Sequence, residues 1–327
     1  MHESYTIEST RKIEDNISSN LEAINEQSRN YVKDILILIK KEVGINKVLS
    51  ILLFGSQRAK SEATAVSDCD LLIIFKNRVS NHHIKEIEKY FIALEIKHKF
   101  RSFDTKLPNK ILGVIQQTTG IFVSHFLTKV KYWEKANFHK IFRVNKVFSA
   151  VFAPRNIVLG NVVSNSTILY GDNVIEKIKP KIQITFFEMI KSIIMNLMIS
   201  FFSILISVFK NLEPTRYQLE AIKWALKASN FYCFRDTESL EAISERFISF
   251  ERVRGQKSAR RFFNTFLNLR KSPQNDMNFM IRCPIRIIKI HLRAILYKKL
   301  VIRRKKTRIL TKIIEPIIQD RTFPLRI

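Results

Sequence analysis

The chain is poor in glycine, proline and cysteine. Of its 327 residues only 7 are glycine and 8 are proline, while 46% are hydrophobic. These proportions exclude collagen-like segments and long disordered tracts. The three cysteines, Cys69, Cys233 and Cys283, are far apart and match no zinc spacing, so we expect neither a disulfide framework nor a structural zinc site. Together with an N-terminus that shows no secretory signal, they favour a cytoplasmic protein.

Acidic residues are also scarce. The sequence has 56 Lys and Arg against 29 Asp and Glu, which gives a formal net charge of +27. The excess is uneven, because residues 1–180 carry a net +9 and residues 181–327 carry a net +18. A field of this sign attracts polyanions such as nucleotides, RNA, DNA or an acidic membrane face. The alternative is that the charge serves only solubility.

The length permits two domains. Up to about residue 178 strands alternate with helices, which indicates a mixed α/β sheet with helices packed on it. We expect strands at about 47–54, 69–75, 100–104 and 121–128, and helices at 9–43, 107–119 and from an N-cap at Asn81 to His98. Residues 138–175 are less regular, and Leu-Tyr-Gly-Asp at 169–172 closes them. We therefore predict an α/β domain at 1–178, followed by an all-α domain at 179–327.

The second domain has a helical pattern throughout. Its helices are expected at about 181–210, 214–233, 237–250, 258–271 and 284–318, with Asp236 and Thr237 as the N-cap of the third. Residues 192–209 carry no charge over a length that just reaches a membrane span. Serine and asparagine recur every three or four residues on one face of this helix. That polar stripe favours a buried bundle helix, so we expect no membrane span.

The most informative stretch is 48–75. An apolar run ends at Gly55 and Ser56, and a second apolar run begins with Asp68 and Asp70. Residues i and i+2 of a strand lie on the same face, so the two carboxylates point the same way. Carboxylates bind hard divalent cations, and a Gly-Ser turn offers backbone N–H groups close to a polyphosphate. The stretch therefore predicts a metal–nucleotide site.

This arrangement resembles the nucleotidyltransferase superfamily related to DNA polymerase beta. Many minimal members read Gly-Ser-Arg-Ala-Arg-Gly-Glu-Ala, followed by Ser-Asp-x-Asp-Leu. This chain has Gly-Ser-Gln-Arg-Ala-Lys-Ser-Glu-Ala at 55–63, one residue longer, and Ser-Asp-Cys-Asp-Leu at 67–71. The resemblance covers about residues 30–175 and is sharp only over 51–75. A Leu-Tyr-Gly at 169–171 is similar to one near the end of many minimal catalytic domains.

The resemblance implies an enzyme that transfers a nucleoside monophosphate from an NTP, most simply ATP, to an acceptor in a Mg²⁺-dependent reaction. The acceptor would be a protein side chain, an aminoglycoside-like small molecule or an RNA 3′ end. By resemblance, Asp68 and Asp70 would bind Mg²⁺ and take part in catalysis, and the nucleotide would be held by Gly55, Ser56, Arg58 and Lys60. For Arg58 and Lys60 the alternative is that they are simply solvated.

The family usually adds a third acid on a nearby strand as the general base. The run at 121–127 carries no carboxylate, so Asp104 is the best remaining candidate, with a helix cap as its alternative role. His125 is a second candidate base, although a histidine on a half-buried strand is more often structural. If the third acid is missing, the protein would be a weak or inactive nucleotidyltransferase-fold module that binds nucleic acid or a partner, in the manner of an antitoxin.

The C-terminal stretch at 282–312 holds twelve Lys and Arg and no acid, interleaved with apolar residues, and its charge is densest at 303–306. Such a basic amphipathic helix suits a nucleic-acid backbone or an acidic membrane surface. A bundle helix with a solvated charged side is the alternative. We take nucleic acid as the expected partner. Arg286 and His291 also have the Arg-x4-His spacing found in HEPN-type ribonucleases.

Overall fold

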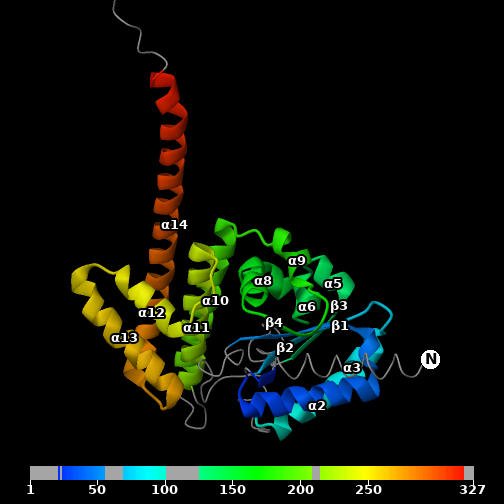
Figure 1. Ribbon diagram of the computed structural model, residues 1–327. Helices are drawn as coiled ribbons and strands as arrows, with labels where there is room; N and C mark the ends of the chain where they lie inside the picture. The colour runs from blue at the N-terminus through cyan, green and yellow to red at the C-terminus, as the bar shows by residue number, and fades with distance from the viewer. Residues whose placement is uncertain (1–20, 23, 56–68, 101–124, 208–213, 320–327) are drawn as a thin grey trace, which may run out of the picture.

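The computed structural model describes residues 21–22, 24–55, 69–100, 125–207 and 214–319, with side chains as far as Val301. A four-stranded sheet lies between two layers of helices, and further helices pack at one side of it (Figure 1). The predicted fold class, an α/β unit with a mixed sheet followed by a helical region, is confirmed. The long helix at the C-terminal end extends well beyond the rest of the molecule (Figure 1).

The sheet has the strand order β3-β2-β1-β4. Its strands are β1 (Val48–Phe54), β2 (Asp70–Phe75), β3 (His125–Lys129) and β4 (Thr167–Gly171). β1 is antiparallel to both β2 and β4, whereas β2 and β3 are parallel, so the sheet is mixed as expected. The first two strands agree with the predicted ranges, because continuous apolar runs of this length are typical of fully buried strands. The predicted strand at 100–104 and helix at 107–119 lie largely outside the described residues.

Side chains alternate between the two faces of the sheet. Leu53, Leu71 and Leu127 face α2 (Glu26–Glu42) and α3 (Asn81–Lys97), in one buried cluster. Leu52, Leu72 and Phe126 belong to a second cluster on the opposite face. Helix α3 is capped by Ser80 and not by Asn81, because the Ser80 hydroxyl accepts the backbone N–H of His83 at 3.0 Å. The predicted cap was wrong by one residue.

Short helices cover the second face. They are α5 (Val130–Glu134), α6 (Phe138–Ile141), α7 (Lys146–Val151), α8 (Arg155–Ser164) and α9 (Ile175–Ile178), with 3₁₀ turns at Ile45–Lys47 and Lys179–Lys181. Residues 138–175, which were expected to be less regular, form short helices and the strand β4. Helices of four to ten residues are too short to show a helical period in the sequence.

The helical region contains α10 (Phe186–Ile206), α11 (Pro214–Phe234), α12 (Leu240–Ser249), α13 (Val253–Lys271) and α14 (Met277–Gln319). Helix α11 packs against α10, α14 and α8. Ser239 caps α12 by accepting the N–H of Ala242, so the predicted caps Asp236 and Thr237 were wrong. The Asp236 carboxylate instead pairs with Arg246 at 2.9 Å.

The second hydrophobic cluster is continuous between the two regions. It runs from Leu52 on the sheet, through Leu159 of α8, to Ile222 of α11 and Ile287 of α14. The boundary at 178/179 stays a prediction. Among the described helices, α10 is long and apolar enough to cross a membrane by length and composition.

Candidate functional site

Two of the predicted site residues meet at one edge of the sheet. Phe54, the last residue of β1, pairs with Asp70, the first residue of β2. Gly55 follows Phe54 with φ at +81°, a conformation that favours glycine. A Cβ atom at Gly55 would lie 2.2 Å from Oδ2 of Asp70. Only glycine therefore allows the backbone to come this close to the carboxylate, which is half-buried.

The other predicted site residues all lie outside the described residues: Ser56, Arg58, Lys60, Asp68 and Asp104. Within the part of the chain that the structure describes, no group of three or more His, Cys, Asp and Glu side chains is arranged to hold a metal ion. The roles of Asp68 and Asp70 as metal ligands thus stay predictions, as does the third acid. The structure describes one part of the site, the close approach of Gly55 to Asp70.

His125 lies on the other face of the sheet. It pairs with Leu71 on the neighbouring parallel strand, so it shares the face that α3 covers, and Asp70 alternates to the opposite face. Its Nδ1 lies 2.7 Å from Oε1 of Glu95, and both side chains are buried. This geometry favours the structural role of His125.

Glu95 is a buried acid that sequence reasoning missed. Glu95 lies one helical turn after Phe91, which is on the inner face of α3. This spacing is the sequence signal that places Glu95 on the same inner face. Its charge and that of Asp70 also reach the buried phenol of Tyr31. Burial, with smaller contributions from Glu95, Cys69 and Asp70, raises the pKa of Tyr31 well above its usual range. The phenol of Tyr31 therefore stays neutral even at alkaline pH.

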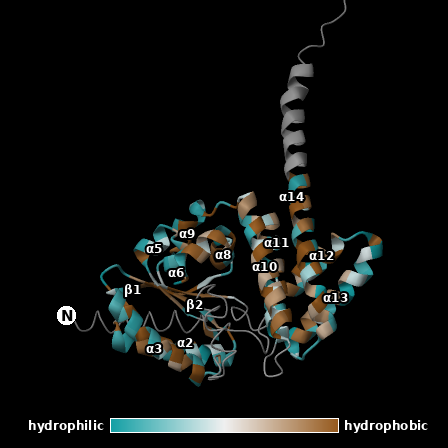
Figure 2. Ribbon diagram, turned by 180° about the vertical axis from the view of Figure 1, so that it is seen from behind, coloured by the Kyte–Doolittle hydropathy of each residue, from teal (hydrophilic) through white to brown (hydrophobic). Residues whose placement is uncertain are grey.

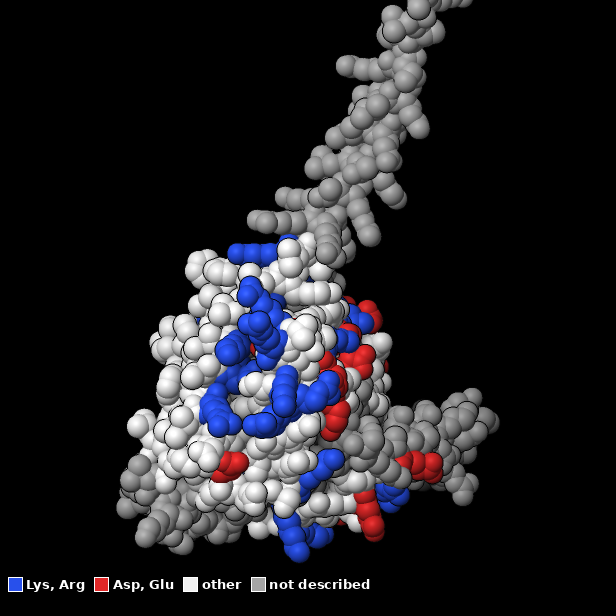
Figure 3. Space-filling model, turned by 90° about the vertical axis from the view of Figure 1, so that its left-hand side faces the viewer, with Lys and Arg blue, Asp and Glu red and all other residues white. Residues whose placement is uncertain are grey.

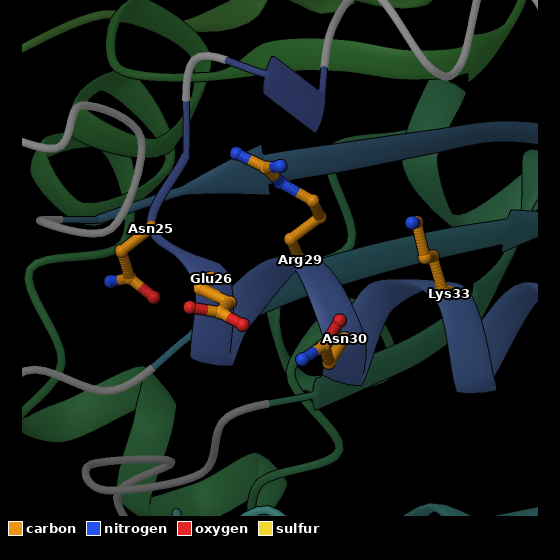
Figure 4. Close-up of a pocket in the computed structure, with 5 residues that line it drawn as sticks. All are labelled: Asn25, Glu26, Arg29, Asn30 and Lys33. Carbon is orange, nitrogen blue, oxygen red and sulfur yellow. The ribbon is translucent and has the colours of Figure 1, made fainter.

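Two pockets are lined by described residues. One of about 610 Å³ is lined by Asn25, Glu26, Arg29, Asn30 and Lys33, and Figure 4 shows Arg29 and Lys33 extending from the same side of α2. A second, of about 300 Å³, is lined by residues of β3 and α6, among them Lys129 and Lys140. None of the described residues that line these two pockets was predicted from the sequence as part of the site.

Cationic side chains gather on one face of the helical region, where α12 and α13 lie (Figure 3). The exposed ones include Arg254, Lys257 and Arg261 of α13. Within the predicted basic stretch of α14, Arg286 and Arg293 pair with Glu251 at 3.5 and 3.0 Å. The side chains of 303–306, where the charge is densest, lie outside the described residues. The nucleic-acid interface thus stays a prediction.

The Arg-x4-His pattern is part of the bundle core. His291 is fully buried, with Nε2 3.1 Å from the amide nitrogen of Asn196 on α10. On its other side, Nδ1 lies 3.1 Å from the Ser229 hydroxyl and 3.0 Å from the Tyr232 hydroxyl, both on α11. Burial lowers the pKa of His291 to about 3. A neutral, enclosed imidazole suits a structural role, so the spacing does not indicate ribonuclease chemistry here.

Comparisons with solved structures find proteins of similar fold. No family model matches the chain, and no curated protein sequence matches it. The fold is similar to the crystal structure of spectinomycin adenyltransferase AAD(9) from Enterococcus faecialis with ATP and spectinomycin, at 8% sequence identity and a TM-score of 0.47. The similarity covers 81% of this chain and 98% of that one. Because a likeness of this size carries no functional argument, function must be argued from this chain's own residues.

Proposed function

We propose that the protein is a nucleotidyltransferase that moves a nucleoside monophosphate from an NTP, most simply ATP, to an acceptor in a Mg²⁺-dependent reaction. One observation carries the proposal: Gly55 approaches Asp70 where two adjacent antiparallel strands meet. These residues belong to the two segments, 55–63 and 67–71, on which the sequence resemblance depends.

Gly55 and Asp70 suit a magnesium–nucleotide complex. Asp70 supplies carboxylate oxygens, the ligands that Mg²⁺ prefers, and the missing side chain of Gly55 leaves the space beside Oδ2 that a Cβ would fill. Asp68, two residues earlier, is proposed as the second ligand. A bound Mg²⁺ would neutralise charge on the triphosphate and on the transferred phosphoryl group.

The chain's own groups would then bind and orient the substrates. The backbone N–H groups at Gly55 and Ser56 are proposed to hold the outer phosphates, with Arg58 and Lys60 as further phosphate contacts. The acceptor oxygen attacks the α-phosphorus, the bond from that phosphorus to the bridging oxygen breaks, and pyrophosphate leaves. Asp104 is the proposed base that takes the acceptor's proton.

The test is transfer from each of the four NTPs, labelled at the α-phosphate, by the full chain with Mg²⁺ and fractions of cell RNA, protein and small molecules. We expect labelled acceptor and released pyrophosphate. Asp70→Asn should abolish both with little change in the melting temperature, whereas Asp172→Asn, at an exposed aspartate after β4, should leave transfer intact. Unchanged Mg·NTP affinity of the Asp70→Asn protein in calorimetry would refute the assigned site.

The cationic face in Figure 3 favours a second candidate, a catalytically inactive nucleotidyltransferase-fold module that binds nucleic acid. In this case RNA affinity should survive Asp70→Asn. The logarithm of affinity should fall with the logarithm of salt concentration by about 0.7–0.9 per phosphate contacted. The double variant Lys257→Gln/Arg261→Gln should make that slope less steep, by the contribution of about two phosphate contacts. An unchanged slope would remove α13 from the interface. In the enzyme reading, the same face favours an RNA 3′ end as the acceptor.

A further inference from the structure

Helix α10 has its polar side inside and its apolar side outside. Ser192, Asn196, Ser200 and Ser203 are all fully buried. The residues on the opposite side are exposed, from 42% to 76% at Phe187: Phe187, Ile194, Met198, Phe201 and Leu205. A surface helix of a water-soluble protein normally has the reverse arrangement. The outer side of α10 is thus built for an apolar neighbour.

Hydrogen bonds fix this orientation of α10. The Ser200 hydroxyl donates to the side-chain oxygen of Gln218 at 2.7 Å, and the Ser203 hydroxyl donates to the carbonyl of Pro214 at 2.5 Å. Asn196 meets His291 of α14. Buried polar groups are costly when they lose their partners, so α10 cannot turn its apolar side inward without leaving these groups unsatisfied. The apolar side stays exposed.

Helix α14 extends the apolar surface. Along one side of α14, six apolar residues at helical spacing are exposed: Ile281, Ile285, Ile288, Leu292, Leu296 and Leu300. The most exposed of them is Ile285, at 61%. Ile288 and Leu292 lie within one helical turn of His291, through which α14 contacts α10. Figure 2 shows hydrophobic residues along both helices, which lie side by side. An exposed apolar surface of this extent marks a protein or membrane contact. We call the eleven exposed side chains of α10 and α14 the apolar face.

Among described side chains, the charges that the two helices of the apolar face expose are of one sign. Between Met277 and Val301, α14 has six Lys and Arg and no acid. Of these, Arg282, Lys289 and Lys299 are exposed. The one acid of α10, Glu188, is buried and accepts the backbone N–H of Asn156 at 2.8 Å. The apolar face is thus bordered by cations.

This combination identifies the class of partner. A second copy seated on the same face would bring the cations of α14 against each other, which is unfavourable. Nucleic acid requires cations at the centre of its contact, where this face is apolar. An anionic bilayer satisfies both features, because acyl chains accept the apolar side chains and headgroups attract Lys and Arg at the border.

We propose that the apolar face docks on an anionic phospholipid bilayer, with α10 and α14 lying along the interface. Helix α10 does not cross the membrane, since its polar side is occupied by hydrogen bonds to α11 and α14. This inference is independent of the nucleotidyltransferase proposal. It differs from the sequence expectation, which gave the helix at 192–209 a wholly buried position and took nucleic acid as the partner.

The experiment is flotation of the full chain with vesicles of phosphatidylcholine alone and with vesicles that also contain phosphatidylserine. We expect binding to the second kind, weakened but not abolished by salt. The triple variant Ile285→Gln/Leu292→Gln/Leu296→Gln should lower the partition coefficient at least about tenfold, because each change removes an inserted apolar side chain. The double variant Arg282→Gln/Lys289→Gln should lower it about fivefold per cation.

The matched control places the same change on other helices. Ile37, Val147 and Val151 are exposed at 65%, 71% and 53%, so their triple Gln variant should bind vesicles like the unaltered chain. The Asp70→Asn protein should also bind normally, which separates this test from that of the enzyme. The proposal is overturned if phosphatidylserine vesicles bind no protein or bind the first triple variant equally well. It is also overturned if that variant instead abolishes a dimer or RNA binding.

Discussion

The buried imidazole of His291 makes the stability of the fold depend on pH. In the unfolded chain this histidine binds a proton below a pKa of about 6.5, but in the folded bundle burial lowers the pKa to about 3. Between these values only the unfolded state carries the proton. The free energy of unfolding therefore falls as the pH falls, by up to about 1.4 kcal/mol per pH unit.

The size of the effect follows from the two pKa values. Lowering the pH from 7 to 5 should cost about 2 kcal/mol from His291 alone, because the unfolded histidine is almost fully protonated at pH 5 and the folded one is not. This figure is insensitive to the folded pKa as long as that pKa lies well below 5. The loss would continue down to about pH 3, where the folded protein also accepts the proton.

The assay is urea unfolding, followed by circular dichroism at pH 7, 6 and 5. The unaltered chain should lose about 2 kcal/mol more than His291→Gln over this interval, although the variant is less stable at pH 7. Other titrating groups contribute equally to both proteins, so the difference isolates His291. His82→Gln, at an exposed histidine, is the control and should keep the slope. Equal slopes for His291→Gln and the unaltered chain would refute the buried, neutral imidazole.

Two further substitutions test the packing. Gly160→Ala should destabilise the fold by about 1–3 kcal/mol, because the new Cβ would lie 2.1 Å from the Cζ of Phe231. Adding Phe231→Leu should recover part of the loss in the same urea titration, and no recovery would contradict the contact. Glu220→Gln should cost about 3–5 kcal/mol, because it leaves Arg270, which is 1% exposed, without its carboxylate partner at 3.3 Å. A loss below about 1 kcal/mol would show that this pair is hydrated.

Much of the fold was predictable because its elements have strong local signals. β1 and β2 are apolar runs, and α10 is a long helical run with one polar side. α7 was missed, although Asn145 caps it with two hydrogen bonds, because a helix of six residues has no period. The cap of α12 was misplaced because four polar residues precede that helix and a partner, Arg246, takes Asp236.

Part of the candidate site was also predictable from the sequence, and part was not. The nearness of Gly55 and Asp70 was predictable, since a turn and an acid at the facing ends of two neighbouring strands are brought together by antiparallel pairing. The face of the sheet on which His125 lies was not predictable. It depends on the register between β2 and β3, which a long crossover connects. The outward orientation of the apolar side of α10 was also hidden, since periodicity shows that a helix has two sides and not which one faces the interior.

Helix α8 lies where the two predicted domains meet, and this position links their unfolding. Its N-terminal amide at Asn156 is satisfied by Glu188 of α10, and its Gly160 packs against Phe231 of α11. Separating the chain at 178/179 would leave that amide uncapped and would open the shared core to water. We therefore expect heat or denaturant to unfold sheet and bundle together in one cooperative step. Evolution of either half is then constrained by the fit of α8 to the other.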